Sequence, residues 1–134
     1  MKRVAFGLAA LFAIVAIAGL FSACVNNPRV VRELREQPDG DRAKKVMLLT
    51  LPSGKTLPVN YLHEGDKVYA ASDFLWHREL RDGPGPVTLL LQGRELRGRA
   101  RIVDREPEYR ADVFSRLRPS APGFTGVMVE IQLD

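Results

Sequence analysis

From Val46 onward the chain alternates short apolar runs with turns that contain glycine or proline. Val46–Leu51 is almost entirely apolar, which predicts a strand buried on both faces. Two later runs flank Glu64-Gly65-Asp66, a sequence typical of a short hairpin loop. The predicted strands are Val46–Leu51, Leu57–His63, Lys67–Ala71, Val87–Gln92, Glu95–Val103 and Val127–Leu133.

Two of these strands show strict alternation. A period of two places successive side chains on opposite faces of a sheet. The expected core face carries Leu96, Gly98, Ala100 and Ile102 in one strand and Val127, Val129, Ile131 and Leu133 in the other. The expected opposite face carries Arg97, Arg99 and Arg101, and then Met128, Glu130 and Gln132.

Two short helices are predicted beside the strands. Arg29–Gln37 follows Pro28 and has an apolar stripe, and we expect it to plug one end of a barrel. A second helix opens at Asp104-Arg105-Glu106-Pro107 and runs to about Leu117. Its expected inward residues are Tyr109, Val113, Phe114 and Leu117.

The order of these elements favours a mainly β fold. No βαβ rhythm appears, so a parallel sheet is disfavoured. About six antiparallel strands with short flanking helices form a barrel most readily, because closure removes the exposed sheet edges. The predicted organisation is an N-terminal segment over residues 1–25, a short helix and linker over 26–43, and a barrel domain over 44–134.

Residues 4–25 form an apolar segment without any charged side chain. As a helix this segment would span about 33 Å, enough to cross the ~30 Å hydrocarbon core of a membrane. We therefore expect a single-pass anchor that contacts membrane lipid, on a side that the flanking charges leave undecided. A lipoprotein acylated at Cys24 and a cleaved secretory signal are the alternatives.

Composition narrows the possible functions. The 134-residue chain has a formal net charge of +4, too mild to predict a nucleic-acid partner. A single cysteine allows no intrachain disulfide, and one cysteine with two histidines makes a Cys/His zinc site improbable.

Three local features are candidates for chemistry, each with a simpler structural explanation. The Pro52–Thr56 turn offers N–H groups, the Ser53 hydroxyl and the Lys55 ammonium to a phosphate, or is an ordinary hairpin turn. Trp76 is a wall for a flat aromatic ligand, or it closes one mouth of the barrel. The arginine row Arg97, Arg99 and Arg101 holds an anionic ligand, or it is a solvated sheet face.

Several short motifs occur in a characteristic order. They are Val46-Met47-Leu48-Leu49-Thr50-Leu51, Ser53-Gly54-Lys55, Leu57-Pro58-Val59-Asn60-Tyr61, Glu64-Gly65-Asp66, Val68-Tyr69-Ala70-Ala71-Ser72 and Trp76. In this order the chain resembles the split-barrel family of deazaflavin-dependent nitroreductases and quinone reductases. That family is related in fold to the FMN-binding pyridoxamine-phosphate-oxidase barrels.

The resemblance implies a cofactor site and a reaction. It assigns Ser53, Gly54 and Lys55 to the phosphate, Pro58 and Val59 to the ring, and Ala71, Ser72 and Trp76 to the opposite wall. The implied cofactor is a deazaflavin (coenzyme F-420), with FMN as the alternative. The implied reaction is hydride transfer to a quinone or nitro compound, and the resemblance also implies a possible homodimer.

The chain departs from the family pattern at the phosphate-binding turn. The family's arginines before and after Ser-Gly are replaced by Leu51-Pro52 and a shortened Lys55-Thr56-Leu57. The loop before Trp76 is missing, and Glu79-Leu80 stands where the family has Asn-Leu. A smaller flavin, another ligand, or a non-catalytic membrane-tethered binding or assembly module therefore remain alternatives.

Overall fold

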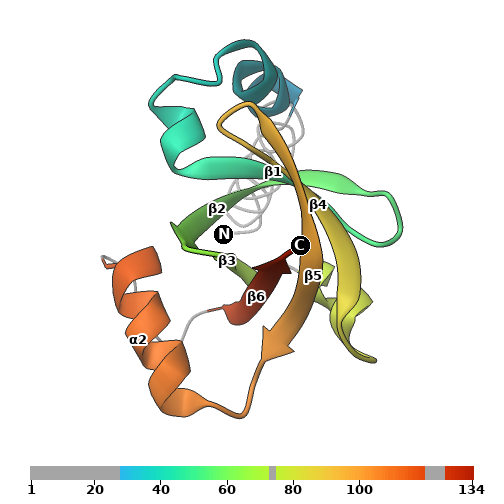
Figure 1. Ribbon diagram of the computed structural model, residues 1–134, viewed down its shortest axis with the longest axis vertical. Helices are drawn as coiled ribbons and strands as arrows, with labels where there is room; N and C mark the ends of the chain where they lie inside the picture. The colour runs from blue at the N-terminus through green and yellow to red at the C-terminus, as the bar shows by residue number, and fades with distance from the viewer. Residues whose placement is uncertain (1–27, 73–74, 120–125) are drawn as a thin grey trace, which may run out of the picture.

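The fold was examined in a computed structural model that describes residues 28–72, 75–119 and 126–134 (Figure 1). A helix covers residues 28–36. The further elements are η1 (Arg42–Lys44), β1 (Val46–Thr50), β2 (Thr56–Glu64), β3 (Lys67–Ser72), η2 (Leu75–Leu80), β4 (Gly85–Leu91), β5 (Arg94–Val103), α2 (Pro107–Leu117) and β6 (Val127–Leu133).

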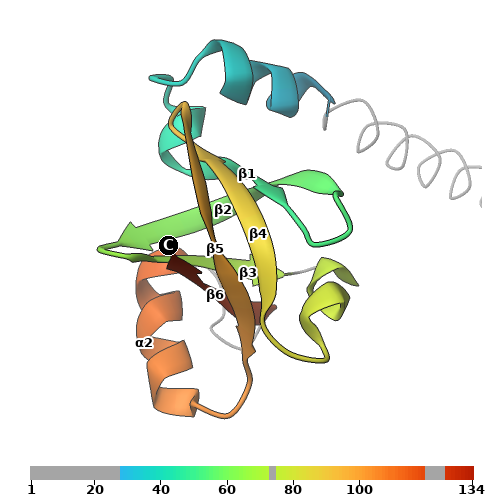
Figure 2. The ribbon, with the colours of Figure 1, turned by 45° about the vertical axis from the view of Figure 1, so that its right-hand side comes forward.

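The six strands close into an antiparallel barrel in the order β1-β2-β3-β6-β5-β4 (Figures 1 and 2). Closure pairs β1 with β4, where Leu49 lies opposite Leu89. This architecture confirms the predicted mainly β fold with about six antiparallel strands. Each predicted strand is present, with ends that differ from the predicted ends by no more than two residues.

The barrel interior is filled by alternate residues of every strand. Met47 and Leu49 of β1 are fully buried there, together with Val68, Leu89 and Ile131. The intervening Leu48 points to the other face and is also buried. β1 is therefore covered on both faces, as its unbroken apolar sequence predicts.

The helix over residues 28–36 does not plug an end of the barrel. Its Leu34 packs with Ala43 and Leu48 on the outer face of β1 and β4. The apolar stripe was predicted correctly, but its partner was wrong. Leu48 and its neighbour Leu90 present an outward apolar surface, which needs a cover, and this helix supplies it.

One mouth of the barrel is closed by η2. Trp76 and Leu80 of this short helix belong to the interior cluster and are 7% and 2% exposed. This packing bears out the structural explanation of Trp76, namely that it closes one mouth of the barrel. It also fixes the orientation of η2, because both anchors lie on the same side of it.

α2 covers the outer face of β3 and β6 (Figure 2). Val113 and Phe114 are buried against Tyr69 and Met128, with Tyr109 and Leu117 partly buried beside them. The inward set of the helix is therefore as predicted. Met128 and Glu130 lie on the face opposite the barrel interior, and because α2 covers that face they are 0% and 6% exposed.

The predicted membrane segment over residues 4–25 lies outside the described residues. In the three ranges that the structure describes, no helix has the length and apolar character that crossing a membrane requires.

Candidate functional site

The turn between β1 and β2 is the centre of the candidate site. Gly54 adopts a φ of +92°, which a residue without a side chain reaches most easily. The Leu51 N–H donates to the Lys55 carbonyl and the Gly54 N–H to the Leu51 carbonyl, each at 2.8 Å. The Lys55 N–H lies 3.3 Å from the Ser53 hydroxyl oxygen. Local bonds therefore hold the turn in one shape.

Glu79 of η2 binds this turn through both carboxylate oxygens. The Ser53 N–H donates to Oε1 and the Ser53 hydroxyl donates to Oε2, both at 2.9 Å. These donors come from a turn 26 residues away in the sequence. The carboxylate therefore sits where the sequence resemblance predicts a phosphate.

A pocket of about 540 Å³ opens beside this contact. Its walls come from β2, the end of β3, η2 and the residue after α2. The lining residues are Lys55, Leu57, Pro58, Val59, Asn60, Ala71, Leu75, Trp76, Glu79 and Arg118. This pocket is called the β2 pocket below.

The structure brings five of the eight sequence-predicted cofactor residues together around the β2 pocket. They are Lys55, Pro58, Val59, Ala71 and Trp76. Ser53 and Gly54 lie in the adjoining turn, where Ser53 is bonded to Glu79. Ser72 does not line the pocket: it is 2% exposed, and its hydroxyl lies 2.9 Å from Nδ1 of His77.

Five of the residues around the β2 pocket were outside the predicted set of site residues. They are Leu57, Asn60, Leu75, Glu79 and Arg118. Glu79 had a signal in the sequence, because it stands where the resembled family has asparagine. Arg118 had none, since only the packing of α2 against β2 and β3 brings the end of this helix to the pocket.

A second cavity, of about 690 Å³, lies between β2 and the helix over residues 28–36. It shares Lys55, Leu57 and Pro58 with the β2 pocket. Arg32 and Arg35 line its far side. Leu57 and Pro58, near the start of β2, therefore line both cavities.

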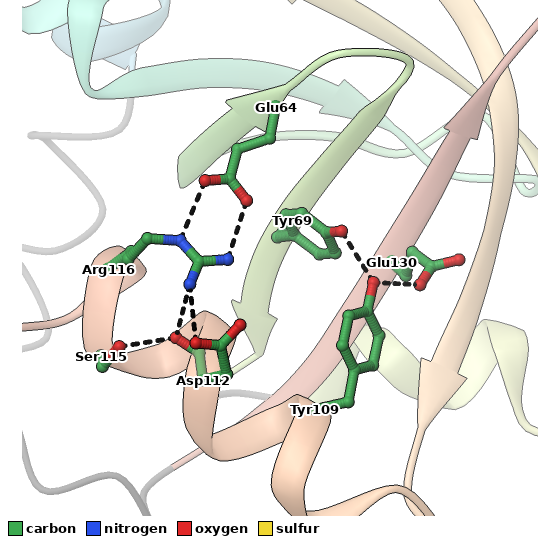
Figure 3. A network of polar contacts seen from close by, with 7 residues as sticks. All are labelled: Glu64, Tyr69, Tyr109, Asp112, Ser115, Arg116 and Glu130. Atoms are coloured by element: carbon green, nitrogen blue, oxygen red, sulfur yellow. Dashed lines mark hydrogen bonds and ion pairs between the residues drawn. The ribbon is translucent and has the colours of Figure 1, made fainter.

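A cluster of hydrogen-bonded polar side chains lies between β3, β5, β6 and α2. Glu130 accepts hydrogen bonds from Nε and Nη2 of Arg101 at 3.2 and 3.1 Å. It also accepts a 2.6 Å bond from the Tyr109 hydroxyl (Figure 3). The hydroxyl oxygens of Tyr69 and Tyr109 lie 2.7 Å apart. Tyr69 is the donor of this bond, because the single hydroxyl proton of Tyr109 is donated to Glu130.

These contacts shift the pKa values of the cluster in consistent directions. Burial by itself would raise the pKa of Glu130, but the bonds from Arg101 and Tyr109 outweigh it and lower that pKa. Burial, followed by the bond to Glu130, raises the pKa of Tyr109. The bond to Glu130 raises the pKa of Arg101. Each group is thereby held in its ordinary charge state at neutral pH, which indicates a structural role.

The arginine row is divided by this arrangement. Arg97 and Arg99 are exposed on the outer face of β5, as predicted. Arg101 is half-buried and holds Glu130 and Glu106, the latter through Nη1 at 3.0 Å. No group of three or more potential metal ligands occurs among the described residues.

Comparison with known proteins shows the fold. No protein-family model and no curated protein matches the chain. A Listeria innocua protein assigned as a pyridoxamine 5'-phosphate oxidase is similar at a TM-score of 0.54 and 19% identity, over 67% of this chain and 84% of that one. General stress protein 26 of Bacillus anthracis strain Sterne is 22% identical over 76% of this chain and 90% of that one, at a TM-score of 0.43.

The first similarity shows that the barrel has the split-barrel fold of pyridoxamine-phosphate-oxidase-like proteins. This is the broader part of the sequence resemblance. The narrower part, the deazaflavin-dependent nitroreductases, stays a prediction.

Proposed function

We propose that this chain binds the ring system of a flavin in the β2 pocket and acts as an oxidoreductase. The observation that carries the proposal is the convergence of five predicted cofactor residues on this one pocket. The volume of the β2 pocket lies within the range of about 300–1,000 Å³ that is usual for small-molecule sites. The fold likeness to a protein assigned as a pyridoxamine 5'-phosphate oxidase supports the proposal.

The residues present fit the ring of a flavin better than its phosphate. Pro58, Val59 and Trp76 give the pocket flat or apolar surfaces. In contrast, the donors of the Ser53 turn are already bonded within the chain. A phosphate-bearing deazaflavin is therefore the second choice, after a flavin.

The proposed activity is the reduction of a quinone or nitro compound. A bound flavin supplies the hydride or electron transfer, and the protein supplies orientation and electrostatics. In this chain β2 and η2 would orient the ring. Lys55 and Arg118 bring two cations to the pocket, where they would favour negative charge that develops on a reduced ring.

Filling the β2 pocket tests the proposal. Asn60 is exposed on β2 and lines the pocket, so a tryptophan there is expected to occupy ligand space without disturbing the core. We expect Asn60→Trp to weaken riboflavin binding at least about tenfold. The measurement is quenching of flavin fluorescence by the full-length chain in mild detergent.

Asn60→Ala is the matched control, because it removes the same amide without filling the pocket. Its riboflavin affinity is expected to stay within about twofold of the wild type, as for most surface substitutions. Equal affinities for wild type and Asn60→Trp would place the ligand elsewhere. Absence of binding to riboflavin, FMN and the deazaflavin coenzyme at micromolar concentration would refute the proposed function.

The second candidate function is a non-catalytic membrane-tethered binding or assembly module. The observation that favours it is the internal bonding of the Ser53 turn, which leaves the predicted phosphate site filled by Glu79. Membrane attachment through residues 4–25 is part of both proposals. Fatty-acid labelling of wild type and Cys24→Ala distinguishes a spanning anchor, labelled in neither, from a lipoprotein, labelled only in the wild type.

A further inference from the structure

Glu79 contributes the carboxylate that fills the anion-accepting turn beside the β2 pocket. Both of its oxygens are used, and both partners belong to Ser53. The other N–H groups of the turn donate to the Leu51 carbonyl and to the Ser53 hydroxyl oxygen. A phosphate arriving at this turn would thus find the backbone N–H groups and the Ser53 hydroxyl occupied, while the Lys55 side chain lines the pocket beside them.

The position of Glu79 is set by the barrel core. Trp76 and Leu80, on either side of it in η2, are buried in the interior cluster. Rotation of η2 away from the turn would expose both of these side chains. Glu79 is therefore presented to Ser53 by an element that is anchored in the barrel core.

At the turn itself the charge of Glu79 acts in the same direction as the hydrogen bonds, whereas Lys55 and Arg118, which also line the β2 pocket, act in the opposite direction. Glu79 itself lines the β2 pocket, so a phosphate near Ser53 would approach a carboxylate. Two like charges at hydrogen-bonding distance repel, and because Glu79 is exposed, water and salt moderate this repulsion. A ligand without a phosphate meets no such penalty.

From this arrangement we infer that Glu79 is a specificity-determining residue, which makes the β2 pocket select flat aromatic ligands without a phosphate over their phosphorylated forms. The inference rests on the proposed function, since it assumes that a flavin-like ring enters the pocket. It predicts that riboflavin is preferred to FMN, a pair of ligands that differ only in the phosphate.

The test measures the dissociation constants of riboflavin and FMN for the full-length chain in mild detergent. In the wild type we expect FMN to bind more weakly than riboflavin. In Glu79→Ala we expect the ratio of the FMN to the riboflavin constant to fall at least about tenfold. Glu79→Gln, which keeps the shape and one acceptor oxygen but removes the charge, should give an intermediate ratio.

Two further variants identify the cause. Ser53→Ala in the Glu79→Ala background removes the uncovered hydroxyl and should reverse part of the gain in FMN affinity. Glu95→Ala removes an exposed carboxylate near the start of β5, away from the pocket lining, and should leave the ratio unchanged.

The outcomes separate this inference from the proposed function. If riboflavin and FMN both bind and their ratio is the same in wild type and Glu79→Ala, the role of Glu79 is overturned and the proposed function stands. If neither flavin binds the wild type, the proposed function fails and the ligand selectivity fails with it. Thermal unfolding in the presence of inorganic phosphate then decides whether Glu79 blocks an anion site. If it does, phosphate should raise the unfolding midpoint of Glu79→Ala but not that of the wild type.

Discussion

Replacing Glu130 with alanine is expected to lower the free energy of unfolding by about 3 kcal/mol. Glu130 is 6% exposed and lies between Tyr69 of β3 and Arg101 of β5, its direct partners in the sheet. Its removal leaves the Tyr109 hydroxyl and two guanidinium nitrogens of Arg101 without their acceptor, while Nη1 of Arg101 keeps Glu106. The loss of stability should lie at the low end of the range for breaking a buried ion pair. The reason is that the Arg101 side chain is 39% exposed and can bind water in place of the carboxylate.

Urea unfolding of the full-length chain, followed by tryptophan fluorescence, measures this loss. Glu106→Ala is the matched control, since Glu106 pairs with the same arginine but its side chain is 49% exposed. The control should cost less than about 1 kcal/mol, as exposed pairs usually do. Similar losses in both variants would contradict a special role for the buried carboxylate.

The same carboxylate should make stability depend on pH. Its pKa in the folded state is lowered from the ordinary value of 4.5. A lowered pKa stabilises the fold fully above the unfolded value, and the stabilisation is lost as the pH falls through the folded value. The difference between wild type and Glu130→Gln should therefore be constant above about pH 6 and shrink below about pH 4.5. If the stability difference between wild type and Glu130→Gln stayed constant down to the pH of acid unfolding, a lowered pKa of Glu130 would be contradicted.

Replacing Gly98 with alanine is expected to destabilise the barrel by about 3 kcal/mol, at the upper end for inserting atoms into a packed core. A β-carbon at Gly98 would lie 2.4 Å from the Gln132 carbonyl oxygen and 3.0 Å from Cγ2 of Ile131. The carbonyl belongs to the backbone of β6 and cannot turn aside. β5 and β6 would have to move apart at the point where Gly98 pairs with Leu133.

Thermal and urea unfolding check this prediction against Gly65→Ala. Gly65 has a φ of +63° and no heavy atom within 4 Å of an added β-carbon. Its substitution carries only the backbone cost of about 1 kcal/mol for a left-handed residue. If Gly98→Ala were no more destabilising than Gly65→Ala, the close approach of β5 and β6 would not explain why glycine occupies position 98.

The strands were predictable because their signals are local. Val46–Leu51 is a continuous apolar run, and the Glu64-Gly65-Asp66 loop places two strands on either side of one tight turn. Such features depend on residues a few positions apart, so the sequence contains them in full. The antiparallel order of neighbours follows because short turns join strands without a crossover.

The faces of the strands were harder to predict. Met128 and Glu130 alternate with core residues, so the sequence places them on the face opposite the barrel interior without indicating what covers that face. α2 covers that face, and it buries Glu130 with the arginine and tyrosine that neutralise and hold it. Which surface a helix covers depends on residues far apart in the chain, so alternation alone leaves it open.

For the candidate site, the sequence by itself selected five of the residues that line the β2 pocket, because the motifs that resemble a family are contiguous segments. It also marked Glu79 as a departure from the family pattern. Only the tertiary structure decided that Glu79 reaches Ser53 across 26 residues and that Arg118 lies beside them. The reason is physical: burial of Trp76 and Leu80 orients η2, and the packing of α2 positions its end, and both depend on the closed barrel.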